Sequence, residues 1–90
     1  MYAWAIVQNN IGRDMPIRWS GDCRMTRKEI ASHEKAQRFR LVDGDGEACC
    51  YGYFVALDDT PSGFEPLDNY GESMGCVEIQ YLEGGKYTSL

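Results

Sequence analysis

Basic residues are almost absent from the second half of this 90-residue chain. Lys86 is the only lysine or arginine in residues 42–90, against ten acidic residues, whereas residues 1–41 hold eight basic and four acidic residues. The net charges of the two parts, −9 and +4, add to −5. This asymmetry predicts a polarised surface that would steer a partner or support an oligomer, although two solvated faces without a partner would give the same counts.

Long apolar runs are also missing. No stretch approaches the roughly 18 apolar residues of a membrane span, so we expect no membrane association. The apolar start, MYAWAIVQ, lacks a basic n-region and a small-residue cleavage site, which predicts a first strand, not a secretory signal, and hence a cytoplasmic protein. At this length we expect one domain, residues 1–90, with no room for a second core.

Motifs for metals, cofactors and catalysis are absent, and His33 is the only histidine. Residues 43–54 begin like a calcium loop, but Ala48 stands where a glycine is needed and Phe54 where a bidentate glutamate is needed. No Cys-x-x-Cys pair supports zinc, and no phosphate loop or nucleophile motif is present. The sequence therefore predicts a protein without a metal or cofactor, and not an enzyme.

Four cysteines, Cys23, Cys49, Cys50 and Cys76, are an even number that two disulfides would satisfy. Cys49 and Cys50, however, are adjacent in a predicted strand, where successive side chains point to opposite faces. Since no secretory signal is predicted either, free and buried thiols in a reducing compartment are favoured.

A capping box at residues 26–29, Thr-Arg-Lys-Glu, predicts the start of a helix. The threonine hydroxyl accepts a hydrogen bond from the glutamate amide, and the glutamate carboxylate bonds back to the threonine amide. The apolar stripe that follows is thin. We therefore expect a short helix that packs through Ile30 and either Ala31 or Ala36.

The clearest structural signal is residues 38–57, RFRLVDGDGEACCYGYFVAL. Two apolar-rich runs flank Asp-Gly-Asp-Gly, which tolerates positive φ, so a β-hairpin is predicted. A loop of two or four residues gathers small and large apolar side chains on one face, which we expect to lie under the helix, with Gly52 shielded by Phe39. A three-residue loop would reverse the faces. The residues of this predicted helix-covered face are Phe39, Leu41, Ala48, Cys50, Gly52, Phe54 and Ala56.

Further strands are predicted at both ends of the chain. Residues 2–8 are aromatic and β-branched, with apolar side chains on both faces, and residues 77–81 alternate between apolar and polar. Gly84 and Gly85 form a two-residue turn after which residues 86–90 return.

Two long loops complete the prediction, residues 9–24 and the acidic residues 58–75. The predicted fold is α+β: one antiparallel sheet of four or five strands with one short helix packed on one face, in the order β-α-β-β-β-β.

The acidic loop is the first candidate binding site. Its carboxylates would engage a basic surface on a protein partner that handles nucleic acid, so that the protein acts as a non-enzymatic binding module of inhibitor type. The candidate partner-binding residues are Asp58, Asp59, Glu65, Asp68 and Glu72.

The second candidate site is the other face of the hairpin, with Arg38, Arg40, Tyr51 and Tyr53. Arginine beside tyrosine across strands can stack as a cation–π pair. Cations mixed with stacking aromatics are also typical of proteins that bind single-stranded RNA or DNA, which is the alternative function. An enzyme acting on a small molecule is a third hypothesis and would require a polar pocket.

Two segments, RFRLVDGDGEACCYGYF (residues 38–54) and FEPLDNYGESMGCVEIQYLEGGKYTSL (residues 64–90), resemble short uncharacterised proteins of bacteria, phages and mobile elements. In those proteins an Arg-Leu-Asp-Asp-Asp-Gly-like turn leads into a Tyr-rich strand, and an acidic loop leads into a Gly-Cys-x-Glu-Ile-Gln-Tyr strand. Here Cys49 and Cys50 replace the more usual polar or aromatic residues. The resemblance implies no catalytic residue; by analogy with small acidic inhibitors such as anti-CRISPR proteins, it implies inhibition of a host defence complex.

Overall fold

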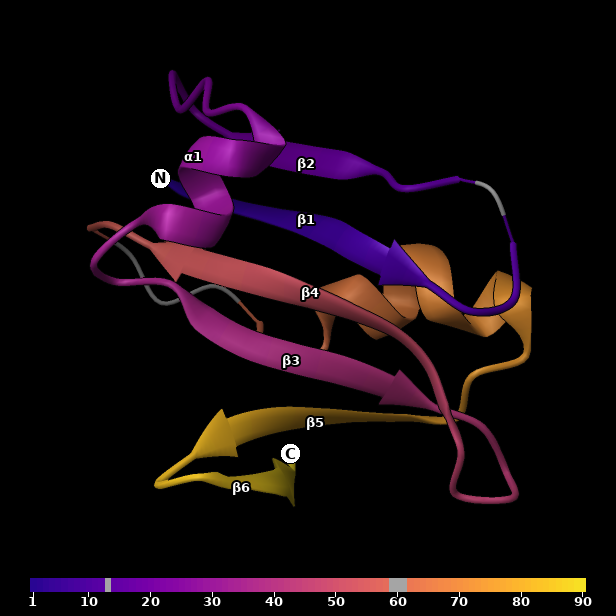
Figure 1. Ribbon diagram of the computed structural model, residues 1–90. Coiled ribbons are helices and arrows are strands. Elements are labelled where there is room, and N and C mark those ends of the chain that lie inside the picture. The colour runs from indigo at the N-terminus through magenta and orange to yellow at the C-terminus, as the bar shows by residue number, and fades with distance from the viewer. Residues whose placement is uncertain (13, 59–61) are drawn as a thin grey trace.

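The computed structural model describes residues 1–12, 14–58 and 62–90, which form a six-stranded antiparallel sheet (Figure 1). The expected antiparallel sheet with one short α-helix is confirmed, but the sheet has six strands, not four or five. In the sheet they are ordered β2-β1-β4-β3-β5-β6. The elements along the chain are β1 (Tyr2–Asn9), β2 (Ile17–Ser20), α1 (Arg27–Ser32), β3 (Gln37–Val42), β4 (Ala48–Ala56), η1 (Leu67–Gly71), η2 (Glu72–Met74), β5 (Glu78–Glu83) and β6 (Lys86–Ser89).

The additional strand is β2, within the predicted loop of residues 9–24. It pairs with β1 through Ala3 opposite Trp19 and Ala5 opposite Ile17. With only four residues, β2 is too short for its sequence to show an alternation of apolar and polar side chains. It forms because the edge of β1 offers unpaired backbone donors and acceptors. The predicted element order therefore lacked one strand before the helix.

The helix and both predicted turns form at the expected positions. Thr26 and Glu29 make both hydrogen bonds of the capping box, and Ile30 is the buried contact of α1. The β3–β4 hairpin turns through residues 43–47, five residues and not two or four, and a register shift in β4 restores the predicted faces, so that Phe39 pairs with Gly52 and Leu41 with Cys50. Gly84 and Gly85 both have positive φ, 57° and 83°, which accounts for the tight turn between β5 and β6.

The two faces of the sheet are covered by different segments, and the predicted cover of the larger one is wrong. In Figure 1 α1 lies in front of the sheet, and η1 and η2 lie behind it. The face that carries Phe39, Leu41 and Phe54 is packed against Leu67 and Tyr70 of the acidic segment, not against α1. We call this the core face; its buried residues include Trp4, Ile6, Phe39, Leu41, Cys50, Phe54, Ile79 and Tyr81.

The opposite face, which we call the helix face, carries the small residues Ala3, Ala5 and Val55 where Ile30 of α1 packs. A six-residue helix with one buried side chain can cover only this small patch. The large aromatic and aliphatic side chains of the core face need a wider cover. The acidic segment supplies it, because its apolar residues point inward while its carboxylates stay near solvent.

A bulge in the β3–β4 hairpin places two cysteines in the same core. Leu41 pairs with Cys50 but Val42 pairs with Ala48, so Cys49 is an extra residue. Cys49 and Cys50 both belong to the core-face cluster, so the expectation that they point to opposite faces is wrong. All four cysteines are free and buried.

These buried thiols predict a loss of stability in alkali. Burial raises the pKa of Cys50 from 9.0 to about 12, so its neutral form is favoured in the folded state. This contribution is complete below pH 9.0 and is lost as the pH rises towards 12, by up to about 1.4 kcal/mol per pH unit. Urea unfolding at pH 7.5 and 10 measures it, and Cys50→Ala should show a smaller pH-dependent loss than the unsubstituted protein. Equal losses would contradict the assignment.

None of the helices in the described ranges combines the length and apolar character needed to cross a membrane.

Candidate binding surface

Arginine and tyrosine side chains meet on the part of the helix face that α1 leaves uncovered. Arg38 on β3 pairs with Tyr53 on β4, and Arg40 pairs with Tyr51, so the four side chains project from neighbouring strands to the same side. All four are half-buried, with part of each side chain accessible. The structure therefore keeps together the four residues predicted as a nucleic-acid site.

A fifth residue, Tyr87 of β6, completes this group. The Arg40 guanidinium lies 4.2 Å from the centre of the Tyr87 ring. Nε of Arg38 donates a hydrogen bond of 2.9 Å to the Tyr87 hydroxyl. The sequence predicted the β5–β6 turn but not that β5 pairs with β3, which is what brings β6 to the arginines. We call Arg38, Arg40, Tyr51, Tyr53 and Tyr87 the Arg–Tyr surface.

The arginines of this surface are stacked and held by neutral groups. Arg38 lies 5.0 Å from the ring centre of Tyr51 and 5.5 Å from that of Tyr53, and it donates to the Tyr53 hydroxyl over 3.1 Å. Burial lowers the pKa of Arg38, but the hydrogen bonds to Tyr53 and Tyr87 raise it more, so the charge is retained. These contacts fix both guanidinium planes relative to the rings.

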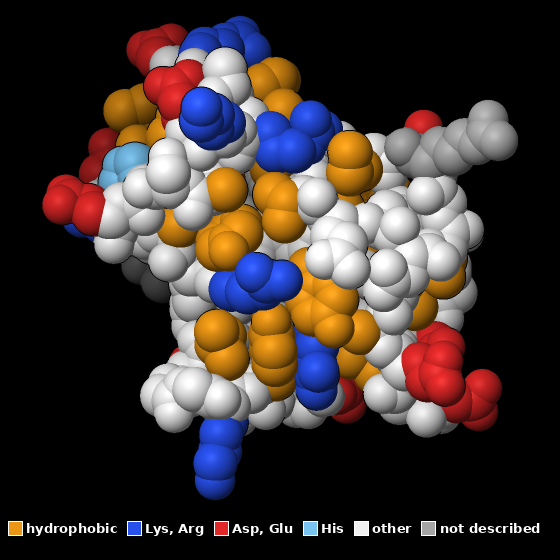
Figure 2. All heavy atoms as spheres, in the orientation of Figure 1, with side chains coloured by type: hydrophobic (Ala, Val, Ile, Leu, Met, Phe, Trp, Pro, Cys, Tyr) orange, Lys and Arg blue, Asp and Glu red, His pale blue; other side chains and the backbone are white. Residues whose placement is uncertain are grey.

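No carboxylate neutralises the Arg–Tyr surface among the described residues. The ion pairs between described residues link the N-terminus to Asp58 and Arg18 to Glu65. Arg40 donates a hydrogen bond of 2.7 Å from Nε to the side-chain oxygen of Gln80. In Figure 2 basic (blue) and hydrophobic (orange) side chains share the centre of this face, and acidic side chains (red) lie towards its margins. On a chain of net charge −5, this is a locally cationic patch.

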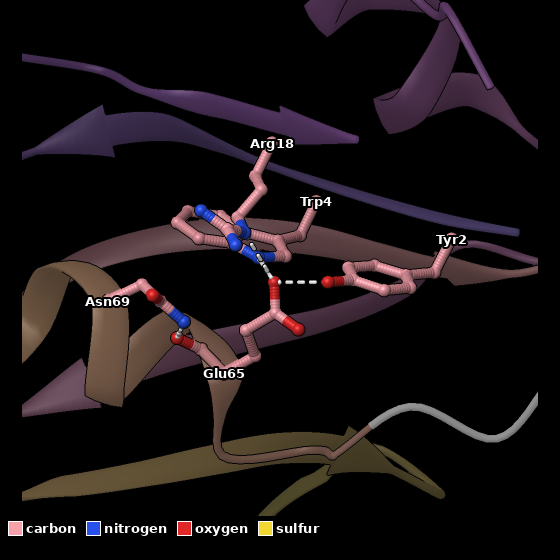
Figure 3. A network of polar contacts seen from close by, with 5 residues as sticks. All are labelled: Tyr2, Trp4, Arg18, Glu65 and Asn69. Carbon is pink, nitrogen blue, oxygen red and sulfur yellow. Dashed lines mark hydrogen bonds and ion pairs between the residues drawn. The ribbon is translucent and has the colours of Figure 1, made fainter. Parts of the chain in front are cut away.

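The acidic segment is organised differently from the predicted binding loop. Glu65 serves the fold: its Oε1 atom accepts hydrogen bonds from the Tyr2 hydroxyl at 2.7 Å, Trp4 Nε1 at 3.2 Å and Arg18 Nε at 2.7 Å (Figure 3). The hydrogen bond to Glu65 raises the pKa of the Tyr2 hydroxyl. We call Tyr2, Trp4, Arg18 and Glu65 the Glu65 network; it fastens the acidic segment to β1 and β2.

The other predicted partner-binding carboxylates are dispersed. Asp58 is exposed and pairs with the N-terminal amine, which lowers the pKa of its carboxyl group. Asp68 and Glu72 are exposed, four residues apart, on η1 and η2. Asp59 lies outside the described residues. The structure therefore brings Glu65 into the fold, and in the described part of this segment Asp68 and Glu72 are the exposed carboxylates that make no side-chain hydrogen bond or ion pair with the rest of the protein.

Chemistry for catalysis or metal binding is sparse in the described ranges. They contain no group of three or more His, Cys, Asp or Glu side chains arranged to hold a metal ion. A pocket of about 150 Å³ lies between η1 and the first two strands. Its walls include neither a cysteine nor a histidine, the residue types that most often act as nucleophile or general base; the residues that line it are Trp4, Pro16, Ile17, Arg18, Asn69 and Tyr70.

Comparisons of the chain with protein-family models, with curated proteins and with solved structures found no match.

Proposed function

We propose that this protein is a non-enzymatic binding module and that its Arg–Tyr surface binds single-stranded nucleic acid. The observation that carries the proposal is that two guanidinium groups, with no carboxylate partner among the described residues, lie over three tyrosine rings on an accessible sheet face. Phosphates would contact the arginines, and unstacked bases would stack on the tyrosine rings or on the guanidinium planes.

An antiparallel sheet is a suitable platform for such a strand. Tyr51 and Tyr53 project from β4 and Tyr87 from β6, with the ring centres of Tyr51 and Tyr87 6.3 Å apart, and a single strand can follow these rings because its bases are not paired. A duplex would present phosphates but hide its base faces from the rings. We therefore expect the surface to prefer single strands over duplexes of the same length.

Fluorescence anisotropy with labelled dT12 and U12 and with a 12-base-pair duplex tests this proposal. With two phosphate contacts the salt dependence should have a slope of about −1.4, which is about a sevenfold weakening between 50 and 200 mM salt. The double substitution Arg38→Gln/Arg40→Gln should weaken binding at least about tenfold and flatten this slope. Replacing Tyr51 by leucine should weaken binding with little change in slope, because a ring and not a charge is lost.

A matched control removes the same number of positive charges outside the Arg–Tyr surface. Lys28→Gln/Lys35→Gln also removes two exposed cations, from α1 and the segment after it, and should leave binding within about twofold. Absence of binding to either oligonucleotide at 50 mM salt, or equal losses in the two double variants, would show that the Arg–Tyr surface is not the site.

The acidic segment supports the inhibitor hypothesis less well, since the Glu65 carboxylate already accepts three hydrogen bonds from within the protein. Binding of a basic protein partner, a CRISPR-type complex by analogy, stays a prediction that rests on Asp68 and Glu72.

A further inference from the structure

The pocket of about 150 Å³ beside the Glu65 network is separate from the Arg–Tyr surface. Its lining residues come from β1, β2, the segment before β2, and η1, whereas the Arg–Tyr surface lies on β3, β4 and β6. Trp4 projects to the core face, and Arg38 and Arg40 project to the opposite side of the sheet. A ligand in this pocket would therefore leave the Arg–Tyr surface free.

The walls of the pocket are mostly apolar and fixed in place. Trp4 is 2% exposed and its Nε1 donates to Glu65, so its ring position is determined by the core. Pro16 adds aliphatic surface just before β2, whereas the side chain of Ile17, opposite Ala5, packs on the helix face. Tyr70 is held through its hydroxyl, which donates to the Asp14 carbonyl at 2.9 Å and accepts from Asn9. A cavity of this volume is about the size that holds a benzene ring.

Polar groups lie on two sides of the pocket. Asn69 donates its Nδ2 to the Glu65 backbone carbonyl at 3.0 Å, which fixes the amide and leaves Oδ1 without a protein partner in the described part of the chain. Arg18 donates Nε to Glu65, and a further side-chain hydrogen bond with Tyr2 raises the pKa of Arg18. Figure 3 shows these two side chains reaching the network from different elements, η1 and β2.

The two terminal nitrogens of the Arg18 guanidinium select the ligand. Two adjacent N–H groups at that end match the two oxygens of a carboxylate, the geometry of bidentate arginine recognition. The ion pair with Glu65 is made through Nε of Arg18 and does not occupy the terminal Nη atoms. The side chain of Arg18 is 51% exposed, so a ligand can reach it from solvent.

We propose that this pocket binds a small planar organic carboxylate, with its ring against Trp4 and Pro16 and its carboxylate on the terminal nitrogens of Arg18. The fit requires a body of about six heavy atoms, the size of one aromatic ring. Such a ligand would bridge β2 and η1, the two elements that the Glu65 network already joins.

Titration with benzoate followed by ¹H–¹⁵N NMR tests the proposal, with benzamide as the neutral probe of the same shape. Benzoate should produce saturable shifts at the amides of Ile17, Arg18, Asn69 and Tyr70, and benzamide should bind at least about tenfold more weakly. Arg18→Met should abolish the preference for benzoate. Since this change also touches Glu65, Asn69→Phe provides a second variant that fills the pocket mouth, keeps the Glu65 side-chain network, and should weaken benzoate at least tenfold.

Arg40→Gln is the control for binding at the Arg–Tyr surface and should leave benzoate affinity at the pocket unchanged. The proposal is overturned by the absence of shifts at the pocket amides, by equal affinities for benzoate and benzamide, or by shifts confined to residues around Arg38 and Arg40.

Discussion

Replacing Glu65 with alanine should lower the free energy of unfolding by about 3 kcal/mol, a large part of the total for a domain of this size. The substitution leaves three donors without their acceptor. Trp4 dominates, because its indole N–H is buried and cannot be hydrated, at a cost of about 1–3 kcal/mol. Tyr2 is half-buried and adds less, and Arg18 is largely in water, where an ion pair contributes at most about 1 kcal/mol.

Urea unfolding, followed by tryptophan fluorescence, measures this change. Glu65→Gln keeps one oxygen acceptor and should lose clearly less than the alanine variant, which separates the loss of hydrogen bonds from the loss of charge. Glu72→Ala, an exposed carboxylate on the same segment, should change stability by less than about 0.5 kcal/mol. If Glu65→Ala and Glu72→Ala behave alike, the Glu65 network does not anchor the segment.

The second large effect is expected at Gly52, at the centre of β4. A Cβ atom built there would lie 2.5 Å from Phe39 Cζ and closer than 3.0 Å to the Ala5 carbonyl oxygen. Phe39 is completely buried and the carbonyl belongs to the paired strand β1, so neither can move away freely. Gly52→Ala should therefore cost about 3 kcal/mol despite adding a single methyl group.

Gly44 in the hairpin loop offers the matched substitution, because a Cβ there meets no atom within 4 Å and its φ is not positive. Gly44→Ala should be neutral or slightly stabilising through the unfolded state. Thermal unfolding of the two variants side by side should separate their midpoints by more than about 10 °C. Near-equal midpoints would mean that β1 and β4 shift apart at Gly52 to accept the methyl group.

Local sequence signals predicted local structure well. The capping box at Thr26, the Asp-Gly hairpin loop and the Gly84–Gly85 turn each depend on a few adjacent residues, and all three form at the expected positions. The alternation predicted that Phe39 and Gly52 share a face, but their direct pairing depends on the register shift in β4. What these signals share is that a hydrogen bond or a φ requirement between near neighbours decides the outcome.

The errors concern which distant segments pack together. The residues 58–75 carry many carboxylates, glycines and prolines, and this composition did not show that Leu67 and Tyr70 cover the hairpin face predicted to lie under the helix. The role of Glu65 is also absent from any local pattern, since its donors lie on β1 and β2. Tyr87 joined the Arg–Tyr surface only because β5 pairs with β3. Pairing between remote strands is decided by total burial, which a single sequence does not display.

Because α1 packs on one face of the sheet and the acidic segment covers the other, the two faces can be buried only in a certain order as the chain is synthesised. The β3–β4 hairpin and α1 are formed by near neighbours, but the largest apolar face of that hairpin is closed only by Leu67, Tyr70 and β5, which are synthesised later. Until then Phe39, Leu41 and Phe54 face water on a nascent chain. Exposed apolar surface of this kind favours aggregation, so we expect a chain that lacks residues 67–83 to aggregate more readily than the complete one.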